Sequence, residues 1–240
     1  MLSGKPADIL VGGACTFQLP PDPTCASRAR SLLAATMREL HLPPGLIDDA
    51  KLAVSELATN ALNHASSPWF RGMALPELWV WSRTHPASEL VVSVFDAHRE
   101  LWPVNTSTEL LDDHGKGLAI VAALSSCTGA HWSRARFRTS CEGKRVWFAL
   151  GLSAPWPMAD RIVPPAAAAC RLSEVLQARG IQVSRRTDDA GISILAAGGL
   201  NVWVEPKAFS WRTGQGYVQQ PLIDLHETAE HIVSQLEAQR

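Results

Sequence analysis

The spacing of apolar and polar residues along the chain predicts alternating helices and strands. The first helix has Asp22 as its candidate N-cap and Pro23 at its first position. The helix-breaking sequence LPPG at 42–45 separates it from a second helix. The elements predicted for the first part of the chain are a strand at 14–19, helices at 22–40 and about 45–65, strands at 77–84 and 89–96, a helix that follows the glycines at 115–117, and a hairpin whose strands, 131–140 and 144–152, flank 141–143.

A proline-rich stretch at 151–165 interrupts the pattern and predicts a linker over 154–165. This divides the chain into predicted domains at 1–153 and 166–240, the second being a small α/β unit of unknown role. We expect its core to contain Trp203, Phe209 and Trp211. Its predicted elements are a helix at 166–179 closed by Gly180, strands at about 181–186, 191–196, 201–205 and 208–213, and a helix at 224–239.

The helix predicted at 45–65 is amphipathic, and its polar stripe has an unusual composition. On a helical wheel, Asp49, Asn60 and Asn63 lie within about 40° of Glu56, and His64 lies at about 80°. A solvated helix face is the ordinary interpretation, but such faces favour Lys, Glu, Gln and Arg. Short carboxylate and amide side chains one turn apart also suit a hard cation such as Mg²⁺, or Glu56 could serve as a general base.

Two later motifs carry weaker signals. Asp96 ends the apolar strand VVSVFD, where it could accept a hydrogen bond from a ligand amino group or simply start a turn. The glycines of HGKG, Gly115 and Gly117 around Lys116, enter an apolar helix. Glycines at a helix start permit close approach of a phosphate, although a plain loop-to-helix turn has the same appearance.

Composition narrows the function classes. A formal net charge of −1 gives no electrostatic reason to expect direct binding of nucleic acid or of an anionic membrane. The five cysteines form no CxxC pair, which disfavours a zinc or redox motif, and the longest apolar run, at 117–124, is too short to span a bilayer. A cytoplasmic location is therefore expected. The alternating Arg134, Arg136 and Arg138 predict one strand face, either exposed or docking an acidic partner.

Taken in order, the motifs KLAVSELATNALNHA, VVSVFD, HGKGLAIVAALSS and GKRVWFAL resemble those of the GHKL (Bergerat-fold) ATPases. Within that group the chain is most similar to the small actinobacterial ATP-binding proteins related to anti-sigma-factor serine/threonine kinases. The resemblance covers about residues 10–150. It implies an α+β fold, a two-layer sandwich in which a mixed, mostly antiparallel sheet lies under helices and ATP binds between the layers.

The resemblance also implies roles for individual residues. Asn60 would hold the Mg²⁺ that bridges the ATP phosphates, and Glu56 would be the general base that activates a partner's serine. Asn63 and His64 would line the phosphate end, and Asp96 would bind the adenine amino group. Gly115, Lys116 and Gly117 would form the phosphate-side lid, with Lys116 as a candidate charge partner.

This sequence departs from the family pattern at three positions. His98 stands where the family often has glycine and could narrow the adenine pocket. Ala119 replaces a third lid glycine, and Gly143-Lys144 replaces a frequent Gly-Thr pair.

The function expected from the resemblance is that of a histidine kinase-like ATPase that regulates transcription. It would use Mg-ATP to phosphorylate a serine on an antagonist protein and would switch between that partner and a sigma factor. A homodimer is a further option. The alternative is a non-catalytic interaction module with a weak or degenerate nucleotide site. His98 and Lys144 favour the module, and the Glu56/Asn60 pair favours the kinase.

Overall fold

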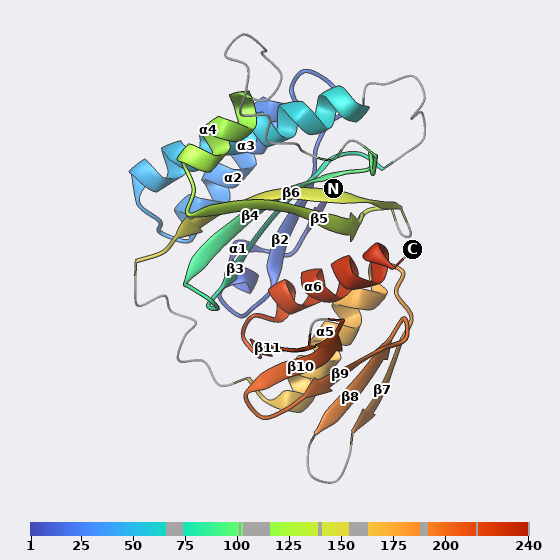
Figure 1. Cartoon of the computed structure of the whole chain (residues 1–240). Helices are drawn as coiled ribbons and strands as arrows, with labels where there is room; N and C mark the ends of the chain where they lie inside the picture. The colour runs from blue at the N-terminus through green and yellow to red at the C-terminus, as the bar shows by residue number, and fades with distance from the viewer. Residues whose placement is uncertain are drawn as a thin grey trace.

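The structure, a computed structural model, describes residues 1–65, 74–100, 102, 116–138, 141–153, 163–187, 192–214 and 216–239. These residues form two antiparallel sheets with helices packed on them, so the chain has the predicted α+β class (Figure 1). In this part of the chain, no helix is both long enough and apolar enough to cross a membrane.

The first sheet has six strands in the order β1-β2-β3-β4-β6-β5. The central strands β3 and β4 are buried along their whole length, which explains their continuous Val- and Trp-rich sequences. The strands are β1 (Leu2–Ser3), β2 (Ala14–Gln18), β3 (Glu77–Arg83), β4 (Glu89–Asp96), β5 (Cys127–Arg134) and β6 (Glu142–Gly151).

One face of this sheet is covered by helices. The helical layer consists of α2 (Cys25–Glu39), α3 (Pro44–Ala65) and α4 (Lys116–Ala123), and a short helix, α1 (Pro6–Ile9), precedes β2. Leu33, Leu57 and Phe148 belong to the apolar core between the two layers. Truncating a buried leucine of this kind to alanine typically costs about 2–5 kcal/mol, so this core fixes the position of α3 over β4.

Residues 163–239, here called the C-terminal unit, form the second sheet and two helices. Its core contains Leu172, Phe209, Trp211 and Ile232, all essentially inaccessible to solvent. The strand order is β11-β10-β9-β8-β7. The elements are α5 (Pro165–Gln177), β7 (Val183–Thr187), β8 (Ser193–Ala197), β9 (Leu200–Val204), β10 (Ala208–Thr213), β11 (Gly216–Pro221) and α6 (Leu225–Ala238).

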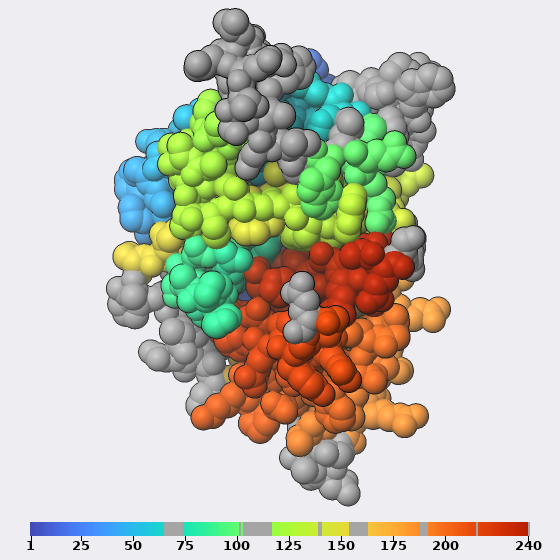
Figure 2. All heavy atoms as spheres, viewed as in Figure 1, coloured from blue at the N-terminus to red at the C-terminus, as the bar shows by residue number. Residues whose placement is uncertain are grey.

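Helix α6 lies between the two sheets and covers the second face of the first sheet (Figures 1 and 2). Its apolar residues pack into the core of the C-terminal unit, while its glutamates contact the first sheet. Glu227 accepts hydrogen bonds from Arg83 and Trp81 at 2.9 and 2.7 Å. We call the contact between these α6 glutamates and arginines of residues 1–153 the α6 interface. Its ion pairs join Glu227 to Arg83, Glu230 to Arg145, and Glu237 to Arg134 and Arg99.

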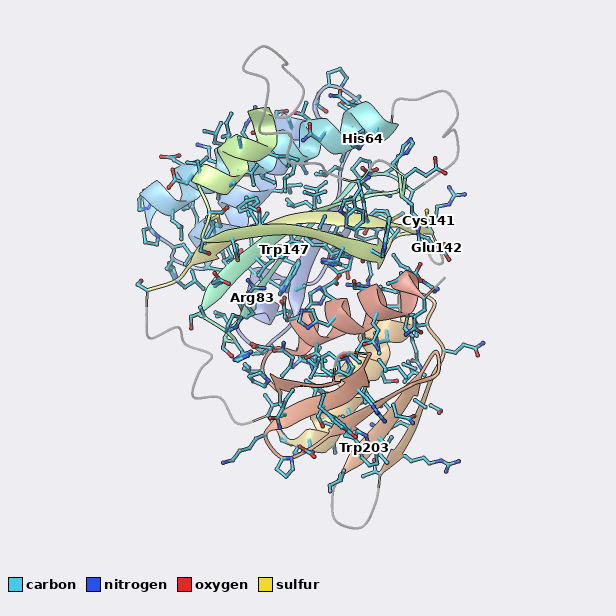
Figure 3. All side chains as sticks on the ribbon, viewed as in Figure 1. His64, Arg83, Cys141, Glu142, Trp147 and Trp203 are labelled. Atoms are coloured by element: carbon cyan, nitrogen blue, oxygen red, sulfur yellow. The ribbon has the colours of Figure 1, made fainter. Side chains whose placement is uncertain are left out.

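Several expectations about individual residues are wrong. The N-cap of α2 is Thr24, and Asp22 instead accepts hydrogen bonds from the Thr24 amide and hydroxyl. Strand β5 ends at Arg134, which is buried against α6, so the alternating arginines form no continuous strand face. Phe209 and Trp211 are buried as predicted, but Trp203 is 41% exposed (Figure 3).

Elements β1, α1 and β11 have no counterpart among the predicted elements. Most of the predicted linker lies outside the described residues, and the domain boundaries at 153 and 166 stay a prediction.

Candidate functional site

The polar stripe predicted on α3 lies at the edge of the helical layer. The opposite side of α3, including Val54 and Leu57, is buried in the core. Glu56, Asn60 and His64 are half-buried. Asn63 is exposed. The stripe is therefore only partly solvated, and two of its side chains, Glu56 and His64, contact other elements.

At the C-terminal end of α3, the side chain of His64 reaches the end of β4 (Figure 3). His64 Nδ1 lies 2.7 Å from Asp96 Oδ2, and Lys144 Nζ donates to the same oxygen at 2.6 Å. The other oxygen, Asp96 Oδ1, accepts the backbone N–H of His98 at 2.8 Å. Both carboxylate oxygens of Asp96 are thus engaged by groups of the protein.

Asp96 and Lys144 are both almost completely buried, with 4% and 1% of their surface exposed. Burial alone would raise the pKa of Asp96. The hydrogen bond from His64 and the charge of Lys144 outweigh this effect and hold that pKa below its ordinary value. The carboxylate is therefore ionised and forms a buried, charge-assisted pair with the ammonium group.

Lys144 also donates to the backbone carbonyl of His98. Its position follows from the sheet, because Asp96 on β4 and Lys144 on β6 are directly paired across the two strands. The neighbouring Gly143 permits this close approach: an added Cβ there would lie 2.4 Å from the Asp96 carbonyl oxygen. The sequence showed Lys144 only as a departure from a pattern, because its place opposite Asp96 is set by the register of two strands that are distant in the chain.

The ring of His98 lies near that of His64, with centroids 5.9 Å apart in an edge-to-face arrangement. His98 is only 8% exposed, and burial lowers its pKa below the ordinary value, an effect that Asp96 partly opposes. We call Asp96, His64, His98 and Lys144 together the Asp96 cluster.

The second end of the candidate site is formed where α3 meets the start of α4. A Cβ added to Gly117 would lie 2.6 Å from Glu56 Oε2, so the Glu56 carboxylate lies directly against the backbone of Gly117. A side chain at this position would have to displace the Glu56 carboxylate. A carboxylate at the first turn of a helix is also favoured by the helix dipole. The structure thus brings together the predicted base and one glycine of the predicted lid.

The remaining predicted residues are placed only in part. Asn60 lies one turn after Glu56 on α3, and Lys116 begins α4. Gly115 and the side chain of Lys116 lie outside the described residues. Among the residues that the structure describes, no group of three or more His, Cys, Asp or Glu side chains is arranged to hold a metal ion.

Comparison with known proteins identifies the class to which this fold and site belong. Residues 19–148, more than half of the chain, match the model of the histidine kinase-like ATPase domain family. The chain belongs to this family, whose ATPase domain implies nucleotide binding. The Asp96 cluster and the Glu56–Gly117 contact both lie within the matched segment.

The chain is also similar to a solved structure, the RsbU and RsbW domains of Rv1364c from Mycobacterium tuberculosis. The two chains share 19% identity with a TM-score of 0.40, and the match covers 60% of this chain and 33% of that one. This chain therefore spans about a third of the length of that structure. No curated protein matches it.

Proposed function

We propose that this chain is an ATP-binding regulatory protein of the anti-sigma-factor serine/threonine kinase type. It would transfer the γ-phosphate of ATP to a serine on an antagonist protein and change partners as a result. The observation that carries the proposal is the contact of Glu56 with Gly117 at the start of α4, inside a segment that matches an ATPase family.

The phosphate end of the site would lie between α3 and α4. Backbone N–H groups at the start of α4 can donate to phosphate oxygens, and the Glu56 carboxylate lies beside them against Gly117. Glu56, beside them, would accept the proton of the attacking serine hydroxyl. Glu56 is half-buried, so part of its side chain reaches solvent.

The side chains near this end fit Mg²⁺ as the companion of a nucleotide. The Asn60 amide oxygen, one turn from the Glu56 carboxylate, is a hard oxygen donor of the type Mg²⁺ prefers, with phosphates and water completing its coordination. When bound, Mg²⁺ would neutralise charge on the phosphates. Asn63 would line this end, as would Lys116 and the glycine at 115, whereas His64, expected here from the resemblance, lies on Asp96 at the other end of the site.

The adenine end would be at the Asp96 cluster. Asp96 would accept the adenine amino group, yet in this structure its two oxygens already accept from His64, Lys144 and the His98 amide. Adenine binding would therefore require Lys144 to move from the carboxylate. We accordingly propose a nucleotide site whose adenine end is closed in the conformation described.

The same observation favours a second candidate function. If Lys144 never leaves Asp96, the chain would be a non-catalytic interaction module that keeps the ATPase fold. The partners would be the same in either case, namely a sigma factor or its antagonist. The two candidates differ in whether nucleotide binds and in whether Glu56 transfers phosphate.

Calorimetric titration with Mg-ATP tests the proposal. Wild type is expected to bind, and Asn60→Ala is expected to bind more weakly because it loses an oxygen donor. Glu56→Gln should bind nucleotide normally but fail to transfer labelled phosphate to an antagonist. Retained transfer by Glu56→Gln would remove this residue as the base. If no nucleotide binds to wild type or to a variant with Asp96 freed from Lys144, the interaction module is the correct function.

A further inference from the structure

We propose that Arg99 and Glu237 are positioning residues through which the C-terminal unit keeps the adenine end of the site closed. This inference rests on the proposed function, because it assigns adenine binding to Asp96. It concerns residues 97–100, the segment that follows β4, and the C-terminal end of α6. Nothing in the motifs shared with the ATPase family points to this connection, since α6 lies outside the matched segment.

The first part of the connection is local. The segment after Asp96 folds back so that the His98 N–H donates to Asp96 Oδ1 at 2.8 Å. Lys144 then donates both to Asp96 Oδ2 and to the His98 carbonyl. The hydrogen bond to the His98 carbonyl therefore helps to hold Lys144 on the carboxylate, and a movement of the His98 backbone would also move Lys144.

The second part of the connection ties this segment to α6. Arg99 Nη1 donates to Glu237 Oε2 at 2.8 Å and to Glu142 Oε2 at 2.9 Å, and its Nη2 donates to the Glu237 carbonyl at 3.0 Å. One guanidinium therefore holds both the side chain and the main chain near the end of α6. Glu142 begins β6, and Figure 3 shows it near that end of α6.

Arg99 is further oriented by an aromatic contact. Its guanidinium lies over the ring of Trp132, 4.7 Å from the centroid. Trp132 on β5 is paired with Lys144 on β6, so the residue beneath Arg99 is the direct strand neighbour of the lysine that binds Asp96. A cation held over an aromatic ring and by two carboxylates has few alternative positions.

The anchor on α6 is itself rigid. The Glu237 side chain is fully buried, and its other oxygen accepts from Arg134 Nε at 2.6 Å. Arg134 is only 4% exposed. Since a buried carboxylate paired with two guanidiniums cannot move without losing both, Glu237 holds Arg99 in place, and Arg99 holds residues 97–100.

The consequence for binding is a population effect. Nucleotide needs the conformation in which Lys144 has left Asp96, and the apparent affinity falls with the fraction of molecules in that conformation. Releasing Arg99 from α6 frees the His98 backbone, so it raises that fraction. The C-terminal unit would thus lower the affinity for the base without touching the phosphate end of the site.

The test compares five chains: wild type, Arg99→Ala, Arg99→Lys, Lys144→Thr and the control Arg171→Ala. Arg171 Nη1 donates to the Val11 carbonyl at 2.8 Å, so this control loosens another contact of the C-terminal unit away from residues 97–100. Each chain is titrated by calorimetry with Mg-ATP and with Mg-tripolyphosphate. The second ligand carries phosphates but no base, so it does not require Asp96. Thermal unfolding confirms that each variant is folded.

Arg99→Ala is expected to lower the Kd for Mg-ATP about 5- to 20-fold and to change the Kd for Mg-tripolyphosphate less than about 2-fold. Arg99→Lys, which cannot hold both glutamates with the same fork, should give an intermediate value. Arg171→Ala should match wild type.

Three outcomes would overturn the inference. If Lys144→Thr binds Mg-ATP more tightly than wild type but Arg99→Ala does not, the site is closed by Lys144 alone and only the coupling to α6 is wrong. If Arg99→Ala changes the Kd values for both ligands equally, or if Arg171→Ala has the same effect as Arg99→Ala, then Arg99 has only a structural role. If neither wild type nor Lys144→Thr binds Mg-ATP, the proposed function itself fails, and the inference with it.

Discussion

Replacing Glu230 with glutamine should test whether the α6 interface depends on its buried charges. Glu230 is 1% exposed, and its Oε1 accepts from Arg145 Nη1 at 3.0 Å and from Arg179. Both guanidiniums lie over the ring of Trp79, at 3.6 and 4.5 Å from its centroid, and neither is exposed to solvent. Glu230 is thus the carboxylate that both buried arginines share.

The magnitude follows from what the substitution leaves behind. Removing one partner of a buried ion pair typically costs about 3–5 kcal/mol, because the remaining charge is buried without compensation. Here two guanidiniums remain. Glutamine keeps an acceptor oxygen, so we expect Glu230→Gln to lower the free energy of unfolding by about 3–5 kcal/mol rather than more. The exposed Glu174→Gln on α5 should cost less than about 0.5 kcal/mol.

Urea unfolding followed by circular dichroism measures both variants, and amide hydrogen exchange shows whether α6 opens first. A double-mutant cycle with Arg179→Met should reveal a coupling of about 1–3 kcal/mol, because the second substitution removes one of the uncompensated charges. A loss below about 1 kcal/mol for Glu230→Gln, equal to that of the Glu174 control, would refute the view that α6 is held by buried charge.

Three further predictions concern pH, the Glu56 contact and the second core. Burial lowers the pKa of His226 from 6.5 to about 4, and neighbouring donors outweigh burial to lower that of Glu227 from 4.5 to about 2. Both shifts make stability fall as the pH falls, that of His226 between about pH 6.5 and 4 and that of Glu227 between about pH 4.5 and 2. Burial raises the pKa of Asp224 from 3.8 to about 6, which opposes the His226 effect, so urea midpoints should fall mainly below about pH 4.5; a flat profile there would contradict this. Gly117→Ala should displace the Glu56 carboxylate and slow phosphoryl transfer at least about tenfold. It should not lower the thermal midpoint, because alanine favours a helix over glycine by about 1 kcal/mol. The control is Gly45→Ala, where an added Cβ meets nothing within 4 Å, and equal transfer rates for the two variants would count against Glu56 as the base. Phe209→Ala should cost about 3–5 kcal/mol in urea, and a cost near zero would show that the C-terminal core does not stabilise the chain.

Local patterns predicted most of the elements that build the site. The amphipathic period of α3 and the apolar run of β4 were visible because each is set by neighbouring residues in the sequence. Asp96 at the end of β4 was found for the same reason. The helix wheel placed Glu56 on a polar stripe but could not show its contact with Gly117, which depends on how α4 packs against α3.

The contacts that close the site could not be predicted in this way. Lys144 reaches Asp96 through the register of two strands 48 positions apart in the chain. Glu227 and Glu230 look like ordinary solvated residues of an amphipathic helix, and they are buried only because arginines from distant strands lie opposite them. Such long-range pairing leaves no periodic signal in the sequence of either partner.

The most direct test of this account is the affinity of Lys144→Thr for Mg-ATP, measured by calorimetry beside wild type. A charge-assisted hydrogen bond of the kind between Lys144 and Asp96 contributes about 1.5–3 kcal/mol. Freeing the carboxylate should therefore lower the Kd by about 10- to 150-fold. The account predicts this gain for Mg-ATP and little change for Mg-tripolyphosphate. An unchanged or weaker affinity for Mg-ATP in a folded Lys144→Thr protein would contradict it.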